Sequence, residues 1–294
     1  MKRLKKKHQQ SATLAIIGAK GNMGRLLASI FSPLFSVIKI DRESTSSDWR
    51  KTWKANIIWL SVPRSSIESL LVEKKFKKEQ LVVDVCSLKR GLGAVVARTG
   101  ATHLSLHPLH GTKVPFIGQR WALIQTLSRG EKHPRGKMLL NFLKEKGISF
   151  LPACSEGKHD FMMGITLSIP EMLTIVLEKI IEKYAEDSNR PVPTQEELMQ
   201  WAVPASNAIF GSYLHLINST PEWLRNEIVR ETPGSLLLSL HQACEEVGGM
   251  SLGNVGKKIK AQSKLVRTIS LCERDRARDW INAWFVDSTK TLFK

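Results

Sequence analysis

The stretch T-L-A-I-I-G-A-K-G-N-M-G at residues 13–24 decides the fold. Five residues of a buried-strand type lead into Gly18, then Gly21 and Gly24 follow, and apolar residues recur at helical spacing up to Phe31. A strand that ends at glycine and restarts as a helix brings main-chain N–H groups and the partial positive charge of a helix N-terminus to one point. The spacing therefore predicts a dinucleotide-binding turn, and a glycine-rich structural turn is the alternative.

The residues after this turn fit a dinucleotide site. A second strand, residues 36–40, ends at Asp41, which is 23 residues after Gly18 and stands where a carboxylate would accept the adenosine ribose hydroxyls. A carboxylate repels the 2′-phosphate of NADP, so Asp41 favours NAD, although Arg42 beside it could soften that preference. We expect NAD to contact Gly18, Lys20, Gly21, Asn22, Met23, Gly24, Asp41, Arg42, Ser61, Val62 and Pro63.

The first half of the chain alternates strands with helices. This alternation predicts an α/β fold with a parallel, doubly wound sheet of Rossmann type. Further strands are expected at residues 57–60, 81–85, 102–106, 121–126 and 148–151, and helices at 45–54, 65–76 (capped by Ser65 or Ser66) and 137–146. A further segment at 91–99 leads to the strand at 102–106. Ligands bind beyond the carboxyl ends of the strands in such a sheet. The polar residues at these strand ends are Gly18, Asp41, Ser61, Ser87 and His107.

From about residue 156 the pattern changes to long helices. They are expected at residues 159–185 with a kink at Pro170, and at 195–217, 221–229, 235–247 and 257–285. Their apolar stripes are more typical of a core or a subunit interface than of a cofactor site. We therefore predict a basic disordered tail at 1–12, a dinucleotide-binding domain at 13–155, and a helical substrate and dimerisation domain at 156–294 that forms a homodimer.

The composition narrows the functional class. With 42% hydrophobic and 24% charged residues, the chain has the composition of an ordinary soluble protein. No apolar run approaches the roughly 20 residues needed to cross a bilayer, and the basic N-terminus is not followed by a signal sequence. We expect a cytoplasmic protein without membrane contact. Its four cysteines, Cys86, Cys154, Cys244 and Cys272, are widely spaced, so we expect reduced thiols and no metal site.

The net charge of +17 is concentrated in the first half of the chain. Residues 1–150 carry 28 Lys and Arg against 9 Asp and Glu, whereas residues 151–294 carry 16 against 18. A basic half can attract an anionic cofactor and an acidic substrate. Nucleic acid is the weaker interpretation, because the basic residues are scattered and no aromatic residues interleave with them. We expect a small acidic substrate and no nucleic acid.

Five motifs follow one another along the chain: G-x-x-G-x-M-G-R, S-V-P, D-V-C-S-L-K, L-H-P-L-H-G and S-E-G-K-H-D. In this order and spacing the chain resembles the prephenate/arogenate dehydrogenase family, from about residue 13 to the last helix. Membership would imply an NAD(P)-binding domain followed by a helical dimerisation domain. It would also imply oxidative decarboxylation of prephenate to 4-hydroxyphenylpyruvate, or of arogenate to tyrosine, in tyrosine biosynthesis.

Three residues are candidates for catalysis. Removing hydride from a carbon that bears a hydroxyl needs a base for the hydroxyl proton, and neutral imidazole suits that task. His107 matches the family's catalytic histidine; the alternative is a strand-end histidine bonded to the main chain. Ser87 would orient the imidazole or the substrate hydroxyl, or be a turn or cap serine. His159 matches a His–Asp pair of the family, in which Asp160 could instead cap a helix.

The departures from the family pattern concern the substrate. The arginine that clamps the ring carboxylate is replaced by His215, and an arginine and a histidine of many relatives fall at Asn207 and Glu171. Histidine does not reproduce the bidentate binding of a guanidinium, and Glu171 is expected to repel an acidic substrate. We expect Lys89 and His215 to bind the substrate. The alternatives are a same-fold dehydrogenase with a diverged substrate and a non-catalytic NAD-binding protein.

Overall fold

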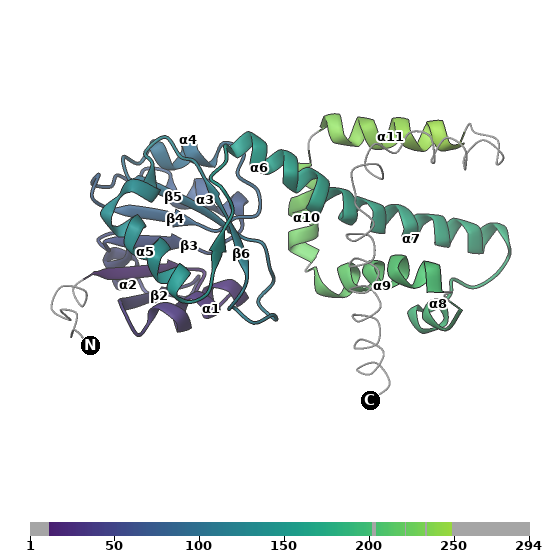
Figure 1. Ribbon diagram of the computed structural model, residues 1–294, viewed down its shortest axis with the longest axis horizontal. Helices are drawn as coiled ribbons and strands as arrows, with labels where there is room; N and C mark the ends of the chain where they lie inside the picture. Colours follow the sequence, from purple (N-terminus) through teal and green to yellow (C-terminus); the bar gives the residue numbers. More distant parts are fainter. Residues whose placement is uncertain (1–11, 202–203, 221, 233, 249–294) are drawn as a thin grey trace. The chain divides into compact units, whose positions relative to one another are not determined.

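The computed structural model describes residues 12–201, 204–220, 222–232 and 234–248. The chain divides into two compact units, Met1–Ile165 and Thr166–Lys294 (Figure 1). The first unit therefore extends beyond residue 156, where the helical domain was expected to begin. Residues 1–11 of the expected tail and the last predicted helix, residues 257–285, lie outside the described residues.

The first unit is built on a seven-stranded sheet with the order β2-β1-β3-β4-β5-β6-β7. Neighbouring strands are parallel except β5 and β6, which are antiparallel. The sheet departs from the predicted parallel arrangement at this pair. Residues 109–119 connect the two strands without a helix, and a parallel connection needs a longer crossover, usually a helix. The strands are β1 (Thr13–Ile17), β2 (Ser36–Ile40), β3 (Ile57–Leu60), β4 (Leu81–Asp84), β5 (Thr102–Pro108), β6 (Arg120–Ile124) and β7 (Ser149–Phe150).

Helices cover both faces of this sheet (Figure 1). Helices α1 (Asn22–Phe31) and α5 (Pro134–Glu145) pack with one set of strand side chains, and α3 (Arg64–Leu71) and α4 (Leu92–Ala97) pack with the other. Helix α2 (Ser46–Thr52) adds Trp49 to the second core. Successive strand side chains point to opposite faces, so β1, β2, β3 and β4 contribute to both cores, whereas β5, β6 and β7 contribute to the first. The predicted doubly wound, Rossmann-type fold is confirmed.

Local interactions set the ends of α2 and α3. Thr45 caps α2, and its hydroxyl accepts the N–H of Asp48. Helix α3 begins directly after Pro63, so neither Ser65 nor Ser66 is its cap. It also ends at Leu71 instead of residue 76, because Glu73 adopts the left-handed conformation (φ 63°), which does not continue a helix.

The end of the first unit and the described part of the second unit are helical. Helix α6 (Glu156–Met163) continues through a π-helical segment, Gly164–Ser168, into α7 (Ile169–Asp187). The kink predicted at Pro170 corresponds to this segment, since proline has no N–H for the regular ladder and a wider turn accommodates it. The predicted helix 195–217 corresponds to α8 (Gln195–Trp201) and α9 (Pro204–Ser219), and residues 202–203 between them lie outside the described residues. The others are α10 (Glu222–Glu231) and α11 (Gly234–Gly248).

The continuous helical segment Glu156–Asp187 is long enough to cross a membrane and contains an 18-residue window with a mean hydropathy of 1.5. The sequence pattern did not predict such a segment. Large apolar side chains on α7 are exposed, among them Leu173, Ile180 and Tyr184. Composition alone does not distinguish a membrane span from a helix whose apolar face packs against protein.

Candidate functional site at the carboxyl ends of the strands

The glycine turn lies where the strand order of the sheet reverses. Strand β1 has β2 on one side and β3 on the other, which makes its carboxyl end the topological switch point where ligands bind in such sheets. Gly18 has a φ of +85°, and a Cβ there would lie 2.2 Å from the carbonyl oxygen of Ser61. A Cβ on Gly24 would lie 2.0 Å from the carbonyl oxygen of Gly18. These two glycines are required by the fold itself.

Gly21 has a different role. The nearest atom to a Cβ built there is the Gly18 carbonyl oxygen at 3.2 Å, so the position is not closed off by packing. Gly21 also precedes α1 without a side-chain acceptor, and the first turn of α1 holds no acidic residue. The first N–H groups of α1 are therefore available to an anion such as a diphosphate.

Asp41 stands beside this turn at the end of β2. Its Oδ2 accepts the N–H of Lys20 at 2.8 Å and its Oδ1 accepts the N–H of Arg42 at 2.9 Å. Burial acts to raise the pKa of Asp41, but these two N–H groups outweigh it and the pKa is lowered. The carboxylate is ionised and each oxygen can accept a further hydrogen bond, as a ribose diol would require. Ser61, Val62 and Pro63 follow β3 and are half-buried on the same rim.

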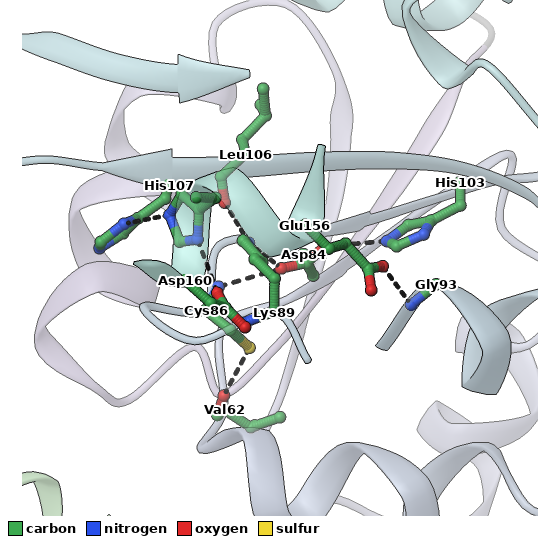
Figure 2. A network of polar contacts seen from close by, with 11 residues as sticks. Val62, Asp84, Cys86, Lys89, Gly93, His103, Leu106, His107, Glu156 and Asp160 are labelled. Carbon is green, nitrogen blue, oxygen red and sulfur yellow. Dashed lines mark hydrogen bonds and ion pairs between the residues drawn. The ribbon is translucent and has the colours of Figure 1, made fainter. Parts of the chain in front are cut away.

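A pair of histidines lies farther along the rim. His107, near the end of β5, is 7% exposed, and His159 on α6 is 3% exposed. Their atoms Nδ1 of His107 and Nε2 of His159 are 3.1 Å apart. Nδ1 of His159 is 2.8 Å from Oδ1 of Asp160, and that oxygen also accepts the main-chain N–H of Lys89 at 3.0 Å. Figure 2 shows these contacts as one connected network.

Local structure explains why these side chains meet. The alternation of β5 puts His103, Ser105 and His107 on one face of the sheet and Leu104 and Leu106 on the other. Helix α6 starts from the cap residue 155, whose serine hydroxyl accepts the N–H of residue 158 at 3.2 Å. The alternative role of Asp160 as a helix cap is therefore wrong, because its carboxylate is bonded to His159 and Lys89.

Lys89 does not present its charge to a substrate. Its ammonium is fully buried, contacts Oδ1 of Asp84 and donates to the carbonyl oxygen of Leu106 at 2.6 Å. The other oxygen of Asp84 is 2.8 Å from Nε2 of His103. Burial acts to raise the pKa of Asp84, but the Lys89 ammonium and His103 hold that pKa well below its usual range. The geometry assigns Lys89 to a buried ion pair instead of the predicted substrate contact.

Asp84 and His103 were missed as members of this network. Each is a lone ionisable residue inside an otherwise apolar predicted strand, and a buried charge requires a partner. That mismatch was the available signal. A buried charge indicates that a partner exists, but it does not say which residue is the partner. That depends on the register of β4 and β5, in which His103 lies opposite Val82, two residues before Asp84 on β4.

His107 is held in the neutral form. Burial is the main reason that its pKa lies well below the ordinary value, and the nearby Lys89 ammonium and His159 add to the effect. Its Nδ1 faces His159, and no described residue is bonded to its Nε2. A neutral imidazole with one ring nitrogen anchored and the other available can accept a proton. His159 contacts His107, so it is placed to act through that ring.

The other predicted residues have different surroundings. Ser87 follows β4 and is half-buried, and its hydroxyl makes no hydrogen bond with a described residue. His215 lies on α9 in the second unit, with an exposed side chain. Glu171 is fully buried, accepts the Thr220 hydroxyl at 2.6 Å and pairs with Nε of Arg225 at 3.2 Å. The expectation that Glu171 repels a substrate is wrong, because its charge is already paired within its own unit.

One cavity of about 470 Å³ lies away from this rim. It is lined by residues at the amino end of β5, including Thr102 and His103, and by Thr126 and Ser128. His107 is at the carboxyl end of the same strand and does not line it. We place the candidate site at the rim, where the uncapped start of α1 and the available imidazole of His107 lie.

Comparison of the sequence with protein-family profiles gives no match, and comparison with curated proteins gives none. Solved structures do match. Prephenate dehydrogenase from Aquifex aeolicus has a TM-score of 0.62 at 15% identity, covering 90% of this chain and 98% of that one. The same enzyme in complex with hydroxyphenyl propionate and NAD+ has a TM-score of 0.60 at 16% identity, covering 90% and 97%.

Arogenate dehydrogenase from Synechocystis gives a TM-score of 0.59 at 16% identity, covering 91% of this chain and 99% of that one. The chain has the prephenate/arogenate dehydrogenase fold. The coverage extends over nearly the whole length of these dehydrogenases, so the likeness is not limited to a generic Rossmann domain. At this identity it concerns the fold, and the roles of individual residues rest on the geometry described above.

Proposed function

We propose that the protein is an NAD-dependent dehydrogenase in which His107 is the catalytic base. The observation that carries this proposal is the buried, neutral His107 imidazole, with one nitrogen held by His159, on the same rim as the glycine turn. A strand-end histidine with a structural role would be expected to bond the main chain. His107 instead bonds a second imidazole backed by a carboxylate, an arrangement typical of acid–base sites.

The rim suits a nicotinamide dinucleotide. The diphosphate would bind at the uncapped start of α1, and the adenosine ribose would bind to Asp41. Three strand spacings separate β1 from β5, about 14 Å in all, a span that an extended dinucleotide crosses. When bound, the nicotinamide would accept the hydride from the substrate carbon. The ionised carboxylate of Asp41 favours NAD over NADP.

The reaction proposed is oxidative decarboxylation of prephenate or arogenate to 4-hydroxyphenylpyruvate or tyrosine. His107 accepts the proton of the ring hydroxyl at Nε2 as the neighbouring C–H bond breaks. Loss of the carboxylate needs no second base, because the product ring becomes aromatic. The fold likeness and the motifs around Ser87, His107 and His159 support this substrate class.

A diverged substrate is the second candidate. His215 occupies the position expected for the clamp arginine and is exposed on α9, and the nearby cation Arg225 is tied to Glu171. Neither offers the free guanidinium fork that binds a carboxylate best. A screen of other cyclohexadienols and hydroxy acids would distinguish this candidate from the first.

We also propose that the protein is a cytoplasmic homodimer formed through its helical unit. The exposed apolar side chains Leu173, Ile180 and Tyr184 on α7 support an interface there. Analytical ultracentrifugation checks this proposal: Leu173→Glu with Ile180→Glu is expected to give a monomer. An unchanged dimer in that variant would place the interface elsewhere.

The test of function is NADH formation by the purified protein with NAD and each substrate. His107→Asn is expected to lower kcat about 1,000-fold, within the range for loss of a general base, while calorimetry shows unchanged NAD binding. Wild-type protein that binds NAD but oxidises neither acid would refute the prephenate/arogenate assignment. If the screen above also gives no turnover, the protein is a non-catalytic NAD-binding protein.

A further inference from the structure

We infer that Asp160 is a positioning residue that acts through His159 to fix His107 in the tautomer whose Nε2 accepts protons. The consequence for turnover rests on the proposed function, but the tautomer assignment does not. It follows from the hydrogen-bond contacts when both imidazoles are neutral.

The series of hydrogen bonds starts at a main-chain N–H, a group that can only donate. The main-chain N–H of Lys89 lies 3.0 Å from Oδ1 of Asp160, so this oxygen is an acceptor. Nδ1 of His159 lies 2.8 Å from the same oxygen. Because Oδ1 carries no proton, Nδ1 of His159 must donate to it.

The donor in each further hydrogen bond is then fixed through both imidazole rings. When His159 is neutral, its ring has one donor and one acceptor nitrogen, so a proton on Nδ1 leaves an acceptor at Nε2. Nδ1 of His107, 3.1 Å away, must donate to that acceptor. The remaining nitrogen, Nε2 of His107, is left without a proton and can act as the base.

A buried ion pair holds the starting point of this chain in place. The ammonium of Lys89 bonds Asp84 and the Leu106 carbonyl with its side chain fully buried. Asp84 also accepts the N–H of Cys86 at 3.1 Å, which closes the turn between them. The Lys89 N–H therefore cannot move away from Asp160 without breaking buried polar contacts, which is costly.

Asp160 also compensates charge during turnover. Once His107 accepts a proton, an imidazolium forms in a site where burial disfavours charge. The carboxylate of Asp160, joined to it through His159, offsets that charge in the way a buried aspartate supports the histidine of a catalytic triad. The side chain of Asp160 is 20% exposed.

The first experiment reads the tautomers directly. In the full-length protein labelled with ¹⁵N-histidine, long-range ¹H–¹⁵N spectra report which ring nitrogen carries the proton, and His107→Asn and His159→Asn assign the signals. We expect wild-type His107 to carry its proton on Nδ1. Asp160→Leu, which removes the acceptor but keeps a similar volume, should increase the Nε2–H form of His107. A wild-type His107 with its proton on Nε2 would overturn the inference.

The second experiment measures turnover. We expect Asp160→Leu to lower kcat about 100-fold with KM changed less than about threefold, because the wrong tautomer cannot accept a proton. Asp160→Asn keeps an acceptor oxygen and loses only the charge, so about a 10-fold loss with the tautomer retained is expected. If Asp160→Leu fails to fold, the test is made with Asp160→Asn. A wild-type kcat in Asp160→Asn would overturn the inference that the charge of Asp160 supports turnover.

The matched control is Glu156→Gln. Glu156 lies on the same helix, and its Oε1 accepts the Gly93 N–H at 2.9 Å, but it does not contact the histidines. Its replacement should leave the tautomers and kcat unchanged; losses equal to those of Asp160→Asn would overturn the specific role of Asp160. Wild-type protein with the assigned tautomer but no NADH formation would refute the proposed function and leave the tautomer assignment standing.

Discussion

The glycine turn and the histidine pair lie on one rim of one sheet, but they are built in different ways. The turn offers main-chain N–H groups at an uncapped helix start, close to the surface. The histidine pair consists of buried side chains whose contacts join residues 52 and 71 positions apart, His107 with His159 and Lys89 with Asp160. A main-chain site follows from local spacing, whereas a side-chain site depends on pairs that only the folded sheet brings together.

Each region contains one lysine–carboxylate pair, which makes the comparison testable. Lys89→Met leaves the Asp84 carboxylate buried without its counter-ion, and we expect the free energy of unfolding in urea to fall by about 4 kcal/mol. The double variant Asp84→Asn with Lys89→Met should recover more than half of that loss. Lys20→Met, which breaks the exposed pair with Glu43, should leave the unfolding curve unchanged. Equal effects of the two lysine substitutions would contradict the comparison.

The glycines of the turn provide the next largest effect. Gly24→Ala places a Cβ 2.0 Å from the Gly18 carbonyl oxygen, so α1 must shift from the sheet, and a loss of about 3 kcal/mol in stability is expected. Gly21→Ala meets its nearest atom at 3.2 Å, so its stability should stay within about 1 kcal/mol of wild type. Its NAD affinity should fall about 10-fold by calorimetry, because the methyl group occupies the anion site. Normal NAD binding by Gly21→Ala would argue for a purely structural turn.

The pH dependence of stability is the smallest expected effect. The pKa of His107 is lowered on folding by burial, the Lys89 ammonium and His159, so only the unfolded state binds a proton just below about pH 6.5. This contribution to stability is complete above that pH and is lost as the pH falls, by at most about 1.4 kcal/mol per pH unit.

Denaturant midpoints measured from about pH 5 to 7.5 check this expectation. His107→Asn should show a flatter pH dependence than wild type over this range. The buried Asp84 has a lowered pKa and acts with the same sign, but only below about pH 4, so it does not interfere. Parallel curves for wild type and His107→Asn would show that the imidazole is not held neutral.

Much of the fold could be predicted because strand positions and glycine spacing are local signals. The seven strands lie close to their predicted positions, and Gly18 and Asp41 end the strands expected for them. The direction of β6 was not predictable from strand composition, because an antiparallel strand buried on both faces reads like a parallel one.

The candidate site was predicted only in part, because local signals identify single residues and not the contacts between them. His107 and His159 could be singled out one by one, and the sheet and α6 bring them together. The role predicted for Lys89 was wrong, because a lysine in a strand-end motif is interpreted as a surface cation when its partner is unknown. The structure shows that its partner is the buried Asp84. Residue type indicates what a side chain can bond, whereas strand register decides which bond it makes.

The place where the first compact unit ends affects how this protein can be dissected. Helix α6 belongs to that unit and carries both His159 and Asp160. A fragment cut at residue 155 would keep every strand and the whole glycine turn, and it could still bind a nucleotide. It would lose both side chains that hold the His107 ring, so nucleotide affinity and acid–base competence would separate at a single cleavage point.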